Sequence, residues 1–204
     1  MTSPIYLASR SPRRRELLKQ IGVKFDPLLL RLASPRGAPD VDEAQKSGES
    51  AADYVERTAR EKAAFGLKVL GMRSLLYRPV LAADTVVIVD GEVLAKPANP
   101  DEAAEFLRRL AGRTHEVRTT IALAIQGPLL AATSVSTVTF RTIDAGEIKR
   151  YCATPEPYDK AGGYGIQGLA AVFIERIEGS YTGVMGLPLY ETAQLLSKTG
   201  IKVL

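Results

Sequence analysis

The sequence has few of the residues on which several large classes of protein depend. Its 204 residues include no tryptophan, one cysteine and one histidine. A lone cysteine, Cys152, cannot form an internal disulfide and has no second thiol for a metal cluster, so we expect a reducing compartment and a structural role. His115 has no partner at the spacing of a metal site or a catalytic triad, which argues against Ser-His or Cys-His nucleophilic catalysis. We expect a structural role for His115 as well.

Membrane and secretion signals are also missing. No run of about 18 apolar residues is present, which argues against a membrane-spanning helix. Residues Met1 to Pro4 lead straight into an apolar stretch, without the basic and apolar regions of a secretory signal. We therefore expect a cytoplasmic protein that makes no membrane contact.

The common phosphate-binding motifs are absent, and the basic residues do not form one tract. Neither a P-loop nor a Rossmann glycine pattern follows the first apolar stretch. The net charge is +4, but Lys and Arg are spread along the chain, and aromatic residues for base stacking are few. A nucleic-acid partner is therefore not expected, and a small polyanion fits better.

The densest basic cluster is the stretch Ser9–Arg15, which follows the apolar run Ile5–Ala8. The run predicts a strand, and Ser11 followed by Pro12 predicts a helix N-cap with proline at the first helical position. Three arginines in the first helical turn oppose the helix dipole, at roughly 0.3–1 kcal/mol each. A bound phosphate would resolve this conflict, because free N–H groups, hydroxyls and arginine forks all suit its oxygens. A solvated basic turn is the alternative.

Helices and strands alternate along the rest of the chain, which predicts a mixed α/β fold in one domain over residues 1–204. Asp90-Gly91 predicts a two-residue hairpin. Prolines and glycines predict an irregular stretch from about 27 to 48 and a polar loop over 179–183. The expected helices begin near residues 12, 50, 99, 144 and 188, the second ending near Phe65, and the expected later strands are 79–89, 92–94, 116–125, 130–140 and 169–177.

Carboxylates and lysines supply the remaining chemistry. Asp84 is the exception in the apolar run 79–89, and Glu43 belongs to an acidic group with Asp40 and Asp42. Mg²⁺ or Mn²⁺ takes one or two protein carboxylates and completes its shell with water and substrate phosphate. The alternative for Asp84 is a strand-end residue that accepts backbone amides. For Lys62 and Lys96 it is a solvated or salt-bridged lysine.

A late segment, Asp159–Gly168, holds four glycines around one charged pair and the amide of Gln167. Backbone without side chains allows the close approach of a ligand at such a place.

With these motifs in this order, the chain resembles the Maf family of nucleoside triphosphate pyrophosphatases over essentially its whole length. The motifs that carry the resemblance are Ala8–Arg14 with Glu16–Leu18, Asp42-Glu43, Ala59–Ala63, Ala83–Val87, Lys96-Pro97, Tyr158–Gly162 with Gly165–Gly168, and Gly186–Pro188. The segment Leu29–Asp40 is longer and richer in proline than is usual in the family.

The resemblance implies an elongated mixed β-sheet flanked by helices, with two lobes and a central cleft as in inosine triphosphatase, and a homodimer. It implies hydrolysis of a nucleoside triphosphate between the α and β phosphates with a divalent cation, Mg²⁺ or Mn²⁺. Asp84 would be the proton acceptor, and Glu43 with Asp84 would hold the metal. The implied substrate-binding residues are Ser9, Arg13, Arg14, Lys62 and Lys96.

The resemblance also implies a substrate class. Arg13, Thr85 and Gln167 match the positions that mark the branch acting on dTTP and UTP. Modified pyrimidine nucleotides are further candidate substrates of this branch. An amide such as that of Gln167 can pair with the O4/N3–H face of uracil or thymine. The alternatives are the branch acting on 7-methyl-GTP, and a nucleotide- or RNA-binding regulator of cell division without turnover.

Overall fold

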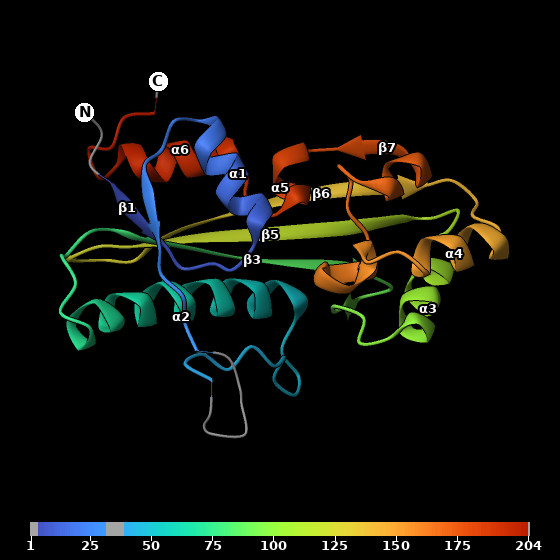
Figure 1. The fold of residues 1–204 in the computed structure, drawn as a ribbon, viewed down its shortest axis with the longest axis horizontal. Coiled ribbons are helices and arrows are strands. Elements are labelled where there is room, and N and C mark those ends of the chain that lie inside the picture. The colour runs from blue at the N-terminus through green and yellow to red at the C-terminus, as the bar shows by residue number, and fades with distance from the viewer. Residues whose placement is uncertain (1–3, 32–38, 204) are drawn as a thin grey trace. The chain divides into compact units, whose positions relative to one another are not determined.

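A computed structural model describes residues 4–31 and 39–203 of the chain. It has a mixed α/β fold built on a seven-stranded sheet (Figure 1). The strand order is β2-β1-β3-β5-β6-β7, and β4 pairs with β3. The strands are β1 (Ile5–Leu7), β2 (Phe25–Pro27), β3 (Val80–Val89), β4 (Glu92–Leu94), β5 (Thr114–Ala124), β6 (Leu130–Phe140) and β7 (Ile174–Glu178).

The sheet combines parallel and antiparallel pairs. β1 is parallel to both β2 and β3, whereas β4 is antiparallel to β3 and β7 is antiparallel to β6. The described helices are α1 (Pro12–Gln20), α2 (Ala51–Met72), α3 (Pro100–Leu110), α4 (Ala145–Cys152), α5 (Tyr181–Met185) and α6 (Leu189–Ser197), with the 3-10 turns η1 (Glu156–Asp159), η2 (Ala161–Gly163) and η3 (Leu169–Phe173). The predicted mixed sheet flanked by helices is confirmed.

The chain divides into two compact units, in agreement with the two lobes expected from the sequence. The first unit is Met1–Asp84, Thr119–Thr133 and Gly186–Leu204, and the second is Thr85–Arg118 and Ser134–Met185. In the first unit α2 lies on one side of the strands and α1 and α6 lie on the other (Figure 1). Each unit has its own core, and that of the first packs α2 residues such as Ala59 and Ala63 against Val80 and Ala122.

Local signals located most element boundaries correctly. The side chain of Ser11 accepts from the backbone N–H of Arg14, and Pro12 is the first residue of α1. The hairpin at Asp90-Gly91 joins β3 to β4, with positive φ at both turn residues. Of the irregular stretch predicted from 27 to 48, residues 32–38 lie outside the described residues.

Helix α2 is longer than the sequence predicted, because it continues past Phe65 to Met72. Gly66 does not end it, since buried Val69 and Leu70 extend the apolar face by another turn. A Cβ atom at Gly66 would lie 2.7 Å from Cγ1 of Val80. The glycine therefore lets α2 pack directly on β3, four residues before Asp84.

Two predictions in the second unit are wrong. Residues 169–173 form the turn η3 rather than the start of a strand, because the Glu156 carboxylate accepts from the backbone N–H groups of Leu169 and Ala170 at 2.7 and 3.1 Å. The predicted loop after Gly179 includes the helix α5. The Ser180 hydroxyl stabilises the first turn of this helix by accepting a hydrogen bond from the N–H of Gly183 at 3.0 Å.

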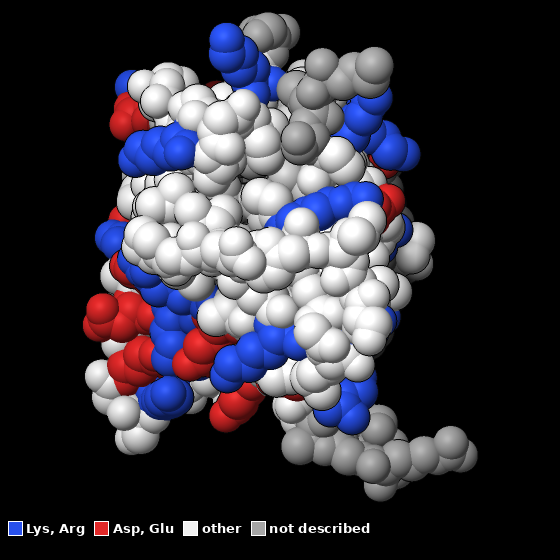
Figure 2. All heavy atoms as spheres, turned by 90° about the vertical axis from the view of Figure 1, so that its left-hand side faces the viewer, with Lys and Arg blue, Asp and Glu red and all other residues white. Residues whose placement is uncertain are grey.

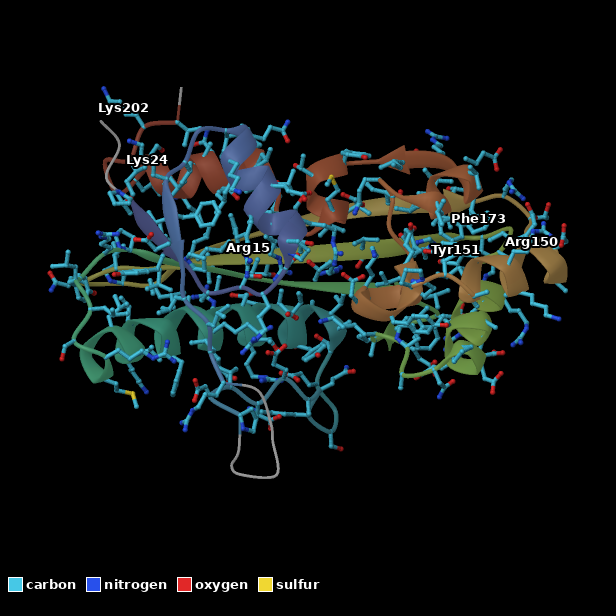
Figure 3. The ribbon with its side chains drawn as sticks, in the orientation of Figure 1. Arg15, Lys24, Arg150, Tyr151, Phe173 and Lys202 are labelled. Atoms are coloured by element: carbon cyan, nitrogen blue, oxygen red, sulfur yellow. The ribbon has the colours of Figure 1, made fainter. Side chains whose placement is uncertain are left out.

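The core of the second unit contains the single histidine. His115 is 3% exposed, and its Nε2 is 2.6 Å from the hydroxyl of Tyr164. Burial lowers the pKa of His115 to about 4, so the imidazole is neutral at physiological pH. Its ring packs edge to face on Phe140, and Tyr151 packs in the same way on Phe173 (Figure 3). The expected structural role of His115 is confirmed, and Cys152 is buried and free.

We expect Gly66→Ala to lower the free energy of unfolding by about 1–2 kcal/mol, because overpacking against Val80 exceeds the gain in helix propensity. The matched control is Gly71→Ala in the same helix, where a Cβ atom meets nothing within 4 Å. This control should raise stability by up to about 1 kcal/mol. Urea unfolding followed by circular dichroism measures both, and equal shifts for the two variants would contradict the close packing of α2 on β3.

Candidate active site

The turn between β1 and α1 presents its polar groups in an ordered arrangement. The Ser9 hydroxyl accepts from the backbone N–H of Ser11 at 3.1 Å, and the Ser11 hydroxyl accepts from that of Arg14 at 3.5 Å. Ser9 is 9% exposed. The side chains of the two serines thereby fix the turn that leads into the helix N-terminus, the end that attracts anions.

Arg14 joins this turn to two other segments of the first unit. Its Nε donates to the carbonyl of Gly186 at 2.7 Å, and one terminal nitrogen donates to the carbonyl of Ala83 at 2.8 Å and to the Ser9 hydroxyl at 3.4 Å. Burial lowers the pKa of Arg14, and the negative charge of Asp84 opposes that shift. The guanidinium therefore holds the stretch Ser9–Arg15, here called the arginine turn, beside the segment of β3 that carries Asp84.

Lys62 is the central charge of the first unit. Its ammonium nitrogen donates to Oδ1 of Asp84 at 2.8 Å and to Oε2 of Glu43 at 2.6 Å. The side chains of Lys62 and Asp84 are 11% and 14% exposed, whereas that of Glu43 is 48% exposed. One cation thus holds two carboxylates that come from a strand and from a loop far away in sequence.

The negative charges of Asp84 and Glu43 affect the neighbouring Tyr54. Tyr54 lies two turns before Lys62 in α2, and its hydroxyl donates to the backbone carbonyl of Glu43 at 2.8 Å. Burial, followed by the charges of Asp84 and Glu43, raises the pKa of Tyr54 to about 12. The hydroxyl therefore stays protonated and remains a donor at neutral pH.

Ser9, Arg14, Glu43, Lys62 and Asp84 are thus brought together in the first unit. Arg13 precedes Arg14 in the first turn of α1, and its positive charge contributes to lowering the pKa of Arg14. A set of three cations and two carboxylates can bind a polyanion, hold a divalent cation and accept a proton.

The other predicted residues belong to the second unit. Thr85 follows Asp84 on β3 and is half-buried, while Lys96 and Gln167 are exposed. The N–H of Gly162 donates to the carbonyl of Ala95 at 3.0 Å, so the glycine-rich segment packs beside the stretch that contains Lys96.

Packing within the protein explains two of the glycines in this late segment. Gly162 has a φ of 68°, and a Cβ atom there would lie 2.9 Å from the side chain of Val87. A Cβ at Gly168 would lie 2.3 Å from the carboxylate of Glu156. The sequence predicted close approach of backbone to a ligand, whereas the close approach seen at these two positions is to the protein's own side chains.

The donor set limits what metal the first unit could hold. Among residues 4–31 and 39–203, no group of three or more His, Cys, Asp or Glu side chains could enclose an ion. Glu43 and Asp84 supply two carboxylates that contact the same nitrogen. This set fits a hard cation that takes one or two protein carboxylates and completes its shell with phosphate and water.

Sequence reasoning missed three residues around Glu43. Arg57 donates to both oxygens of Glu49 and to the backbone on either side of Glu43, and Tyr54 donates to the carbonyl of Glu43 itself. The spacing of Arg57 and Glu61, four residues apart on α2, is the only local signal of this cluster.

The expectations about membrane and nucleic-acid partners concern helix length and surface charge. No helix of the described residues combines the length and apolar character needed to cross a bilayer. On the face drawn in Figure 2, Lys and Arg are scattered and mixed with Asp and Glu rather than gathered in one tract.

Comparison with known proteins gives matches over nearly the whole chain. A family profile described as "Maf-like protein" matches residues 4–199. The dTTP/UTP pyrophosphatase of Aromatoleum aromaticum is 54% identical over 196 residues, which cover 96% of this chain and 95% of that protein. The protein of the same name from Bordetella parapertussis is 55% identical over 199 residues, covering 98% and 94%. The one from Chromobacterium violaceum is 50% identical, covering 98% and 96%.

Among solved structures, the Ham1 protein of Staphylococcus aureus is similar to this chain with a TM-score of 0.44 and 15% identity. The match covers 68% of this chain and 72% of that chain.

We expect Lys62→Met to lower the free energy of unfolding by about 1–3 kcal/mol, because it leaves the mostly buried Asp84 carboxylate without its cation. Lys68→Met is the matched control, since Lys68 is an exposed residue of the same helix and should change stability by at most about 0.5 kcal/mol. Urea unfolding at pH 7 measures both variants. Equal stabilities would show that Lys62 does not neutralise Asp84 in solution.

Proposed function

The chain belongs to the Maf family, and we propose that it is a nucleoside triphosphate pyrophosphatase that converts dTTP and UTP to the monophosphate and pyrophosphate. The relatives at 50–55% identity are dTTP/UTP pyrophosphatases and span nearly the same length as this chain. The observation that carries the proposal is the Lys62 ammonium group bound to both Asp84 and Glu43, beside the arginine turn. We further propose one domain over residues 1–204, which the family match over 4–199 supports.

Asp84 is the general base of the proposed reaction. It accepts a proton from the water that attacks the α phosphorus, and the bond from that phosphorus to the bridging oxygen then breaks to release pyrophosphate. A positioned base contributes about 10²–10⁴-fold to such a step. The hydrogen bond from Lys62 to Oδ1 supports this role, because it orients the carboxylate.

The cations of the site bind the triphosphate. Arg13 and Lys62 spread its charge, and the Ser9 hydroxyl with the first N–H groups of α1 bind phosphate oxygens. Arg14 stays a predicted substrate contact. It also supports the turn, because it donates three hydrogen bonds to protein acceptors. Lys96, from the second unit, is the remaining predicted phosphate contact.

Glu43 and Asp84 would hold the divalent cation, Mg²⁺ or Mn²⁺. When bound, such an ion supplies charge stabilisation for the phosphate oxygens on which negative charge develops. Lys62 contacts both carboxylates and keeps them close together. It thereby limits the repulsion that two neighbouring negative charges would otherwise cause.

Arg13, Thr85 and Gln167 set the specificity for the pyrimidine base in this proposal. The Gln167 amide offers an N–H donor and a carbonyl acceptor, which complement the O4 and N3–H groups of uracil and thymine. Cytosine presents the opposite pattern of donor and acceptor at the same edge. The names of the relatives favour this branch over the one that acts on 7-methyl-GTP.

A homodimer and a cytoplasmic location complete the proposal. The single buried, free Cys152 supports a reducing compartment. The family resemblance supports the dimer.

We expect pyrophosphate release from dTTP and UTP in Mg²⁺ or Mn²⁺, and little from CTP, 7-methyl-GTP, ITP or dATP. Asp84→Asn should lower kcat by about 10²–10⁴-fold because it removes the base. Asp26→Asn is the matched control, since Asp26 is an exposed carboxylate paired with Arg78 and should leave kcat unchanged. A coupled assay for pyrophosphate measures all of these.

Other results would redirect the assignment. Release from 7-methyl-GTP alone would favour that branch of the family. Tight nucleotide binding without turnover would instead support a regulator that holds nucleotide, and full activity of Asp84→Asn would exclude this carboxylate as the base.

A further inference from the structure

The loop that carries Glu43 is held to α2 along its backbone. Three consecutive carbonyls accept hydrogen bonds from side chains of that helix. Arg57 donates to Asp42 at 3.2 Å and to Ala44 at 2.9 Å, and Tyr54 donates to Glu43 between them at 2.8 Å. The backbone on both sides of Glu43 is therefore fixed by α2, although the residues around Glu43 are themselves exposed.

Arg57 uses its full hydrogen-bonding capacity at this place. Beside the two carbonyls it binds both oxygens of Glu49, at 2.6 and 3.0 Å, and Oε2 of Glu61 at 3.1 Å. These five hydrogen bonds match the five N–H donors of a guanidinium group. An ammonium group has three donors and lacks the planar fork, so lysine cannot reproduce this arrangement.

The Arg57–Glu49 pair is well shielded, with side chains 15% and 10% exposed. The hydrogen bonds from Arg57 lower the pKa of Glu49 to about 2, and those from Glu49 raise the pKa of Arg57. Both groups are therefore charged at neutral pH. Bidentate pairs of this kind fix geometry as well as adding energy.

The carboxylate of Glu43 is bound by the same helix, because Lys62 lies further along α2 and donates to Oε2 at 2.6 Å. Both the backbone and the side chain of Glu43 are thus positioned by α2. Arg60, also on this helix, only pairs with the exposed Glu56 in the described contacts.

We propose that Arg57, fixed by Glu49 and assisted by Tyr54, is a positioning residue that sets where the Glu43 carboxylate meets Lys62 and would hold the divalent cation. This inference rests on the proposed pyrophosphatase activity. Arg57 acts through Glu43 and does not touch the reacting atoms. The competing account is that Arg57 only stabilises the folded loop, without a specific effect on Glu43.

The first experiment compares wild type, Arg57→Lys and the control Arg60→Lys. We expect Arg57→Lys to lower kcat/KM for dTTP by about 10–100-fold, the usual effect of removing a residue that orients a functional side chain. Hydrogen–deuterium exchange of the backbone amides in residues 43–48 should become faster. Arg60→Lys should change neither quantity. Tyr54→Phe removes a single hydrogen bond without changing volume, and should lower kcat/KM by about fivefold.

A double-mutant cycle separates the two accounts. In a Glu43→Gln background, Arg57→Lys should lower kcat/KM by less than about threefold further, because coupled residues are not additive. A merely structural Arg57 would lower activity by the same factor in both backgrounds, and that result would overturn the inference. Unchanged kcat/KM with unchanged exchange in Arg57→Lys would overturn it as well.

Failure of the inference is distinguishable from failure of the proposed function. A wild-type protein that releases pyrophosphate from no nucleotide would overturn the function and, with it, the positioning role. An active wild type with an unaffected Arg57→Lys overturns only the inference. Should Arg57→Lys fail to fold, Tyr54→Phe and Glu49→Gln test the same positioning of Glu43, by kcat/KM and by hydrogen–deuterium exchange. Wild-type values of kcat/KM and of exchange in these two variants would contradict the inference.

Discussion

The hydrogen-bonded ammonium group of Lys62 is the interaction on which the rest of the site depends. An ionised lysine with 11% of its side chain exposed is tolerated only when it is paired, because a buried charge without partners is costly. Its two partners are carboxylates, of which Asp84 stands on an otherwise apolar strand. Arg14, at the start of α1, donates to the carbonyl of Ala83, the residue before Asp84. This arrangement holds both carboxylates close together around one cation.

The fold of the first unit serves this arrangement through close packing. Helix α2 lies on β3 with Gly66 against Val80, and the same two elements carry Lys62 and Asp84. The helix also supplies Tyr54 and Arg57, whose hydrogen bonds hold the loop around Glu43. The arginine turn is attached to the end of the same strand segment by Arg14, through the carbonyl of Ala83. For Arg14, these contacts and the negative charge of Asp84 offset the unfavourable helix dipole at the start of α1.

The parts that the sequence predicted are those governed by local signals. Caps at Ser11 and Ser50 and the hairpin at Asp90-Gly91 depend on neighbouring residues, and all three were found. The continuation of α2 to Met72 was missed because it depends on the burial of Val69 and Leu70 in the fold. The turn at 169–173 was missed because it depends on hydrogen bonds to the Glu156 carboxylate. In the site, Asp84 was recognisable as a lone charge in an apolar strand, whereas the pairing of Lys62 with partners 19 and 22 residues away required the fold. Arg57 was missed because most of its acceptors, the carboxylate of Glu49 and two loop carbonyls, are brought to it only by the fold.

Hydrolysis of dTTP in ¹⁸O-enriched water, with mass spectrometry of both products, tests the central claim most directly. The account places the attacking water on the α phosphorus, with Asp84 as its base. It therefore predicts one ¹⁸O atom in the monophosphate and none in pyrophosphate. Label in pyrophosphate, or release of orthophosphate as the first product, would contradict attack at the α phosphorus and with it the assigned role of the Lys62–Asp84–Glu43 site.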